Sequence, residues 1–106
     1  MKMRKLNGVI PVLQSFFRNG DLDETAQQKH IKFLISKKVG GFWALGTGSE
    51  DMNISFKKRI KIAKNISAIN NGKLPLIMGC SFFCEEDVYK FINETGQLNF
   101  DAYHFM

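Results

Sequence analysis

The stretch FWALGTGSED, residues 42–51, decides the fold that we predict for this chain. It opens with apolar residues, which are typical of a buried strand, and runs into glycines and hydroxyl-bearing residues. Gly46 and Gly48 allow the backbone to turn tightly, and the exposed amides of such a turn bind anions such as a carboxylate. Thr47 and Ser49 add hydroxyl donors. We therefore predict a strand that ends in a small anion-binding loop, with an ordinary connecting loop as the alternative.

Short apolar runs and amphipathic segments alternate along the rest of the chain. The apolar runs predict strands over residues 7–13, 41–45, 74–79 and 101–106. Periodic apolar positions predict helices between them, capped by Asp23 and by Ser55, and a third helix from about Glu85 to Thr95. The first helix is expected to close at Gly40 and Gly41. This order of elements is an α/β pattern with a parallel sheet.

The helix patterns also predict which side chains face the sheet. In the first helix the expected inner positions are Ala26, His30, Ile31, Phe33, Leu34 and Ile35, and the expected wet positions are Gln27, Gln28, Lys29, Lys32 and Lys37. In the second helix the apolar stripe is Phe56, Ile60, Ala63, Ile66 and Ile69, and in the third it is Val88, Phe91 and Ile92. Lysines on these helices are expected to face water.

Composition narrows the function classes. The chain has 106 residues, enough for one domain, and 15 Lys and Arg against 10 Asp and Glu. The basic residues are spread along the chain, whereas nucleic-acid binding favours a concentrated stripe, so we expect no nucleic-acid partner. No apolar stretch is long enough to span a membrane, and we expect a cytoplasmic protein. Cys80 and Cys84 would need His30 and His104, far off in sequence, to complete a metal site, so no metal is expected.

The loop after residue 45 does not fit the common nucleotide-binding motifs. A dinucleotide fingerprint would need a third glycine where Asp51 stands, and a Walker loop would need a Gly-Lys pair. In parallel α/β proteins, ligands bind in the loops that follow the carboxyl ends of strands. The pattern therefore favours a small carboxylate over a nucleotide phosphate.

The residues resemble a known family. The run LNGVIPVL, the NGDLD segment, GGFWALGTGSEDMNIS, a following arginine (Arg59) and LPLIMG are similar to the opening of the dihydrodipicolinate synthase and N-acetylneuraminate lyase family. The resemblance implies the N-terminal part of a (β/α)8 barrel, with about three and a half βα units over residues 1–106 and a truncation in strand four. It also implies that the chain is the leading part of a longer protein.

The resemblance carries an activity and site residues with it. It implies a class I aldolase, a lyase or synthase that forms a Schiff base between a lysine and pyruvate or a related 2-keto acid, with no metal or organic cofactor. Thr47 would join a proton relay, and Thr47, the Gly48 amide and Ser49 would bind the substrate. Gly48 and Ser49 stand where the family usually has threonine and glycine. Either the Ser49 hydroxyl takes the role of the missing threonine hydroxyl, or the substrate is a 2-keto acid other than pyruvate. Family members are commonly dimers or tetramers, so a homo-oligomer is expected.

Several alternatives stay open at this point. The Schiff-base lysine and the relay tyrosine of the family would lie beyond Met106, so the 106 residues alone are expected to be inactive. Rival interpretations are a non-catalytic or remnant barrel, or a flavodoxin-like binding domain. Trp43 fits a core residue better than a stacking platform. His104 points either into the barrel, near the site, or outward against a helix.

Overall fold

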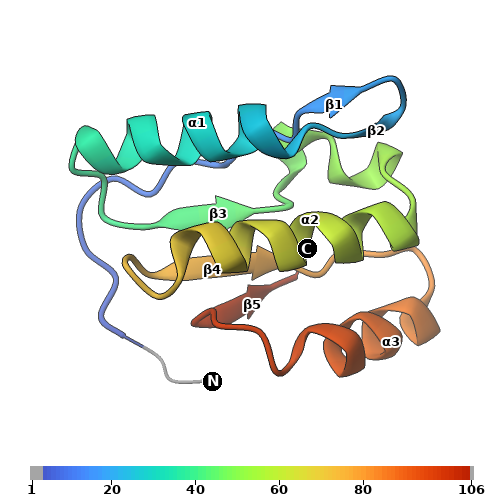
Figure 1. Cartoon of the computed structure of the whole chain (residues 1–106). Helices are drawn as coiled ribbons and strands as arrows, with labels where there is room; N and C mark the ends of the chain where they lie inside the picture. The colour runs from blue at the N-terminus through green and yellow to red at the C-terminus, as the bar shows by residue number, and fades with distance from the viewer. Residues whose placement is uncertain (1–3, 106) are drawn as a thin grey trace.

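The computed structural model describes residues 4–105, apart from the side chain of Ser49. Its main elements are β1 (Phe17–Arg18), β2 (Asp21–Leu22), α1 (Glu24–Ser36), β3 (Phe42–Ala44), α2 (Phe56–Asn70), β4 (Leu76–Gly79), α3 (Glu85–Thr95) and β5 (Ala102–His104). Two short 3-10 helices, η1 (Thr47–Ser49) and η2 (Asp51–Asn53), follow β3. Strand and helix alternate as the sequence predicts (Figure 1).

A parallel sheet in the order β3-β4-β5 forms the centre of the structure. Phe42 pairs with Leu76, and Ile77 pairs with Ala102, so the three strands run side by side in register. In Figure 1, α2 lies in front of this sheet, α1 lies beside the β3 edge and α3 beside the β5 edge. The predicted α/β architecture is confirmed. Met106, at the end of the last predicted strand, lies outside the described residues.

Alternate residues of the strands point to different faces of the sheet. On the helix-covered face Phe42, Ala44, Leu76 and Met78 are fully buried. The other face carries half-buried side chains, and we call it the open face; it consists of Val12, Trp43, Ile77, Ala102 and His104. The hydrophobic core therefore lies between the sheet and the helices. The prediction that Trp43 belongs to the core is wrong, because the pleat directs it to the open face.

Helix α1 begins at its predicted cap. The Asp23 carboxylate accepts a hydrogen bond from the Ala26 amide at 3.0 Å, which satisfies one of the unpaired donors of the first turn. Two predicted side-chain positions are wrong: Gln27 is buried and donates to the Gln14 carbonyl, whereas Phe33 is 57% exposed. The helix also ends at Ser36, earlier than expected.

Residues 7–13 follow the edge of the sheet without forming a regular strand. A single parallel bridge joins Val12 to Trp43, and the Trp43 amide donates to the Pro11 carbonyl at 3.0 Å. Proline has no amide hydrogen, so Pro11 cannot continue the ladder in the other direction. Leu13 is buried, but Val9 is 71% exposed, and the predicted buried strand is therefore reduced to one bridge.

The predicted turn at residues 18–21 is a β-hairpin. Strands β1 and β2 pair antiparallel around Asn19 and Gly20, whose φ angles are 54° and 78°. Two successive positive φ angles match the twist of a two-residue hairpin, and asparagine followed by glycine is the pair that adopts them most readily. The hairpin tip is tied to α2, because Lys61 forms an ion pair with Asp21 at 2.8 Å.

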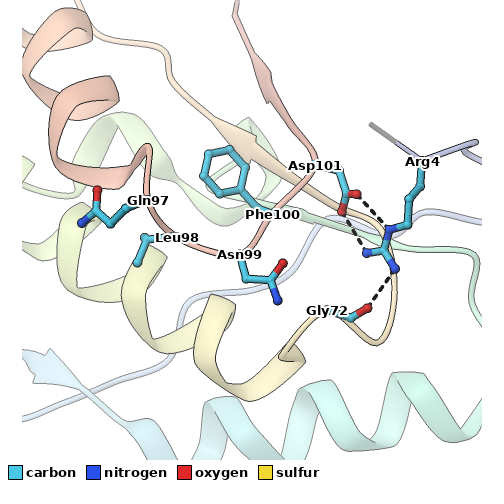
Figure 2. A pocket seen from close by; sticks show the side chains of 7 residues that line it. All are labelled: Arg4, Gly72, Gln97, Leu98, Asn99, Phe100 and Asp101. Atoms are coloured by element: carbon cyan, nitrogen blue, oxygen red, sulfur yellow. Dashed lines mark hydrogen bonds and ion pairs between the residues drawn. The ribbon is translucent and has the colours of Figure 1, made fainter. Parts of the chain in front are cut away.

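The amino ends of β4 and β5 are joined to the start of the chain. Figure 2 shows the Arg4 guanidinium beside the Asp101 carboxylate and the Gly72 carbonyl, at one side of a pocket of about 500 Å³. Arg4 donates to both Asp101 oxygens, at 2.9 and 3.0 Å, and to the carbonyls of Gly72 and Leu74. Asp101 also accepts from the Leu76 amide. These bonds hold the amino ends of β4 and β5, at the opposite end of the strands from the FWALGTGSED loop.

Candidate functional site

The loop after β3 leaves the sheet at its carboxyl end. Leu45 has a φ of 57°, a left-handed conformation that is unfavourable for a bulky side chain and that turns the chain sharply. Gly46 then starts η1, which contains Thr47 and Gly48. The predicted site residues therefore lie at the edge of the sheet where parallel α/β proteins bind their ligands.

A close approach between two strands fixes this turn. A Cβ atom on Gly79 of β4 would lie only 2.0 Å from the Leu45 carbonyl oxygen. Real Cβ atoms do not come this close to a backbone oxygen, so position 79 requires glycine. The Leu45 turn and Gly79 are thus parts of one arrangement, although they are far apart in the sequence.

Thr47 and Gly48 are both exposed on this loop. The first amide that η1 uses internally is that of Glu50, which donates to the Thr47 carbonyl at 3.0 Å. The amides of Thr47 and Gly48 precede it and have no acceptor within that helix. They can therefore donate to an external anion, together with the Thr47 hydroxyl. The side chain of Ser49, the third predicted site residue, lies outside the described part of the chain.

The loop lies against the open face of the sheet. A Cβ atom on Gly46 would be 3.2 Å from Cε2 of Trp43 and 3.1 Å from Cγ1 of Val12, and one on Gly48 would be 3.5 Å from Val12. An anion bound at Thr47 and Gly48 would thus lie next to the open face.

His104 also lies on the open face. It follows Ala102 by two residues on β5, and its ring contacts the indole of Trp43 edge-on, with ring centroids 4.4 Å apart and an interplanar angle of 64°. Of the two orientations that the sequence left open, the structure has the one that points away from the helices. This contact is not among those that the sequence predicts, because it depends on which face of the sheet Trp43 occupies.

Arg59 is a buried cation, and the sequence predicts its match to the family but no role for it. Its guanidinium donates to the carbonyls of Ile54 at 2.9 Å and Ser81 at 2.6 Å, and it lies 4.2 Å above the Phe82 ring. Burial lowers the pKa of Arg59, while the nearby buried Asp51 raises it. Arg59 thus connects the segment after η1 to the loop after β4. Its place on the apolar stripe of α2, four residues before Ala63, was the available signal.

The lysines and the buried cysteine that the structure describes are poorly suited to act as nucleophiles. Every lysine that the structure describes is exposed, as predicted for the helices. Cys80 is buried, and burial raises the pKa of its thiol to about 11, so it is a poor nucleophile at neutral pH.

Within residues 4–105, no three His, Cys, Asp or Glu side chains cluster closely enough to hold a metal ion. None of the described helices is long and apolar enough to cross a membrane.

Comparison with known proteins gives the family. Residues 5–86 match the dihydrodipicolinate synthetase family. The chain belongs to this family. The predicted resemblance is therefore confirmed, and with it homology to the pyruvate-dependent aldolases of the dihydrodipicolinate synthetase family. Among individual members, the protein named "Probable 2-dehydro-3-deoxy-D-pentonate aldolase YjhH" of Escherichia coli K12 is 37% identical over 78 residues, which are 73% of this chain and 26% of that protein.

Solved structures of the dihydrodipicolinate synthetase family match the fold of this chain. The dihydrodipicolinate synthase of Bacteroides thetaiotaomicron superposes with a TM-score of 0.90 and 28% identity, over 99% of this chain and 35% of that one. YagE of E. coli K12, solved in complex with pyruvate, has a TM-score of 0.87 at 23% identity, over 92% of this chain and 33% of that one. The βα units thus match the N-terminal third of a (β/α)8 barrel, as predicted. The chain spans about a quarter to a third of the length of these relatives.

Proposed function

We propose that this chain supplies the first three βα units and the fourth strand of a (β/α)8 barrel lyase that acts on pyruvate or a related 2-keto acid. One observation carries the proposal. This chain is a member of the dihydrodipicolinate synthetase family, and its Thr47 and Gly48 are exposed at the carboxyl end of β3. Their amides form no hydrogen bond within η1. In a barrel of this kind the loops at this end form the active site.

The loop offers what a 2-keto acid carboxylate needs. Hydrogen bonds from uncharged amides and a hydroxyl to a carboxylate are charge-assisted and short, so they hold one end of a small substrate firmly. Thr47 contributes a hydroxyl in addition, which can both accept and donate a proton. We assign to Thr47 the relay of a proton at the reacting carbon, and to the Gly48 amide, with Ser49, the binding of the carboxylate.

The proposed reaction proceeds through a Schiff base. A lysine amine attacks the keto carbon, water leaves, and an imine forms. Loss of a proton from the adjacent carbon gives an enamine, which adds to the carbonyl carbon of an aldehyde and forms a carbon–carbon bond; hydrolysis of the new imine releases the product and the free lysine. The reverse sequence cleaves the bond. The same loop serves both directions, because the carboxylate is present throughout.

The nucleophilic lysine is the part that the described residues do not supply. An amine acts as a nucleophile near neutral pH only when desolvation or a neighbouring cation lowers its pKa, and every described lysine is exposed. We therefore propose that this lysine, and a tyrosine that continues the relay from Thr47, come from the remainder of the barrel. The 106 residues alone are then inactive.

Two relatives support the choice of substrate class. YagE was solved with pyruvate, and the E. coli protein YjhH is named for cleaving a 2-dehydro-3-deoxy sugar acid. Both compounds carry a carboxylate next to a keto carbon. We propose that the substrate of the present protein belongs to this class.

We also propose that the protein is a cytoplasmic homo-oligomer, a dimer or a tetramer. Light scattering after gel filtration would measure the number of subunits.

Borohydride reduction tests the mechanism. The protein that carries this chain is incubated with pyruvate and sodium borohydride, and its intact mass is measured. The proposal predicts a stable added mass equal to one reduced pyruvate per chain, and none without pyruvate. If neither pyruvate nor any of several other 2-keto acids is trapped, the protein is a non-catalytic barrel and the proposed function is wrong.

A further inference from the structure

A groove on the outer side of α2 gathers four lysines. It has a volume of about 580 Å³ and lies between α2 and the tip of the β1–β2 hairpin. Its lining residues are Lys57, Lys58, Lys61, Lys64, Asp21, Gly20 and Ile60. The volume is in the range of about 300 to 1,000 Å³ that is typical of small-ligand sites. With four ammonium groups and a single carboxylate, the groove is suited to an anion.

The rest of the proposed barrel does not cover this groove. In a (β/α)8 barrel each helix lies outside the sheet, between the helices that precede and follow it. Both neighbours of α2 are present in this chain, as Figure 1 shows. Asn65 of α2 donates a hydrogen bond to Glu24 of α1 at 3.3 Å, and the ring of Phe56 lies against that of Phe91 of α3, with centroids 6.3 Å apart. The walls of the groove are therefore complete within the described residues.

Contacts with the hairpin hold two of the lysines in place. The Lys61 ammonium forms an ion pair with Asp21 at 2.8 Å, and the Lys58 ammonium lies 5.8 Å from the centroid of the Phe17 ring. Within residues 4–105, the other two lysines of the groove form no ion pair. Their ammonium groups are therefore available to a ligand.

The helix places these cations where its own energetics oppose them. Like charges three or four residues apart on a helix repel each other, and Lys57, Lys61 and Lys64 have this spacing. No acidic residue of α2 compensates for the repulsion. Two of the lysines also lie in the first turn, where the helix dipole favours acids, whereas α3 has three acidic residues at the same place. A bound anion would remove both penalties.

The spacing of the lysines favours several linked anionic groups over one. A lysine ammonium binds a phosphate as a point charge. A helix rises about 1.5 Å per residue, so Lys57, Lys61 and Lys64 extend along roughly 10 Å of α2. A single carboxylate or phosphate reaches only part of this row, whereas two or three phosphates in succession can meet the whole of it.

We propose that the groove between α2 and the hairpin binds a small anion with two or more linked phosphate groups, through Lys57, Lys61 and Lys64. Inorganic pyrophosphate and the phosphate chain of a nucleotide share this chemistry. None of the residues that line the groove belongs to the Thr47 loop, so this inference does not rest on the proposed function. Asp21 limits the affinity, because its carboxylate repels the anion and occupies Lys61.

Isothermal titration calorimetry of the protein that carries this chain, at an ionic strength of about 0.15 M, tests the proposal. Orthophosphate, pyrophosphate and ADP are titrated separately. We expect pyrophosphate to bind about tenfold tighter than orthophosphate, because it meets a further lysine. ADP should bind as tightly as pyrophosphate if the phosphates alone are recognised, and tighter if the ligand is a nucleotide; both results support the proposal. Equal affinities for orthophosphate and pyrophosphate, or tighter binding of a mixed-sequence single-stranded RNA, would overturn it.

Two charge-matched variants locate the site. Lys57→Gln with Lys64→Gln should weaken pyrophosphate binding by about twentyfold, which is about fivefold for each lost charge. Lys29→Gln with Lys32→Gln, on the exposed side of α1, removes the same charge and should change the affinity by less than about twofold. Because all four lysines are exposed, both double variants should keep the melting temperature of the parent. Equal weakening in the two would show only a general attraction of a basic protein to anions, and the proposed groove would be wrong.

Asp21→Asn gives a change of opposite sign. The substitution removes the carboxylate from the groove and releases the Lys61 ammonium. We expect pyrophosphate to bind about fivefold tighter to this variant than to the parent. An unchanged or weaker affinity in Asp21→Asn would contradict a site that includes Lys61 and the hairpin tip.

Discussion

Asp101 accepts two hydrogen bonds from the guanidinium of Arg4, which lies 97 residues earlier in the sequence. The same carboxylate accepts from the Leu76 amide, so one buried side chain joins the N-terminal segment, β4 and β5. The Arg4 guanidinium beside it lowers the pKa of Asp101. This arrangement holds the amino end of the sheet, opposite to the proposed site, and its contribution can be measured.

We expect Asp101→Asn to reduce the free energy of unfolding by about 2 kcal/mol, because hydrogen bonds to a charged group are lost inside the protein. Since the folded pKa is lowered, the stabilisation is present above the unfolded pKa of about 4 and is lost as pH falls through the folded value. Urea unfolding between pH 7 and pH 2 measures both effects. Asp21→Asn, which removes an exposed ion pair with Lys61, is the control and should change stability little.

Gly79→Ala should prevent the Leu45 turn from forming. The added Cβ would lie 2.0 Å from the Leu45 carbonyl oxygen, and the backbone cannot relax without breaking the β3–β4 register. We expect a loss of about 3 kcal/mol or more in unfolding free energy. Gly48→Ala is the matched control, because its Cβ would meet only Val12 at 3.5 Å. Equal melting temperatures for the two variants would show that the close approach is not required.

Arg59→Met should destabilise the fold by about 3 kcal/mol, because it leaves the carbonyls of Ile54 and Ser81 without a donor and the buried Asp51 without its nearby cation. Lys57→Met, on the exposed side of the same helix, should change stability by less than about 0.5 kcal/mol. Chemical denaturation of both variants gives the comparison. A stability loss no greater for Arg59→Met than for Lys57→Met would contradict the assigned role.

Thr47→Val tests the proposed relay. In the protein that carries this chain we expect turnover to fall by about a hundredfold, as is usual when a proton-transferring group is removed. Because Thr47 is exposed, the unfolding free energy should stay within about 0.5 kcal/mol of the parent value. Thr25→Val, an exposed threonine on α1, controls for the chemical change alone. Full activity in Thr47→Val would remove Thr47 from the mechanism.

The elements of the fold could be predicted because local signals agreed with the tertiary structure. Asp23 and Ser55 cap their helices through the expected hydrogen bonds, and α3 has the predicted bounds. The errors have local causes as well. Phe33, Leu34 and Ile35 are consecutive and lie about 100° apart around the helix, so they span about 200° and cannot all face the sheet. Gln27 is buried with its side-chain amide donating to the Gln14 carbonyl. This contact depends on how a separate segment of the chain packs, which the helix pattern alone does not predict.

The candidate site was predictable in part. The position of Thr47 and Gly48 follows from strand order, since the carboxyl ends of parallel strands share one edge of the sheet. The contact between Trp43 and His104 could not be predicted, because it depends on the register of three strands and on Gly79 between the rings. Composition says nothing about register.

A crystal structure of the protein that carries this chain, soaked with pyruvate, tests the central claim most directly. Our account predicts a carboxylate oxygen within about 2.7 to 3.2 Å of the Gly48 amide nitrogen, and a second contact to the Thr47 hydroxyl. Pyruvate bound elsewhere in the barrel, with the amides of Thr47 and Gly48 donating to no part of it, would contradict the account.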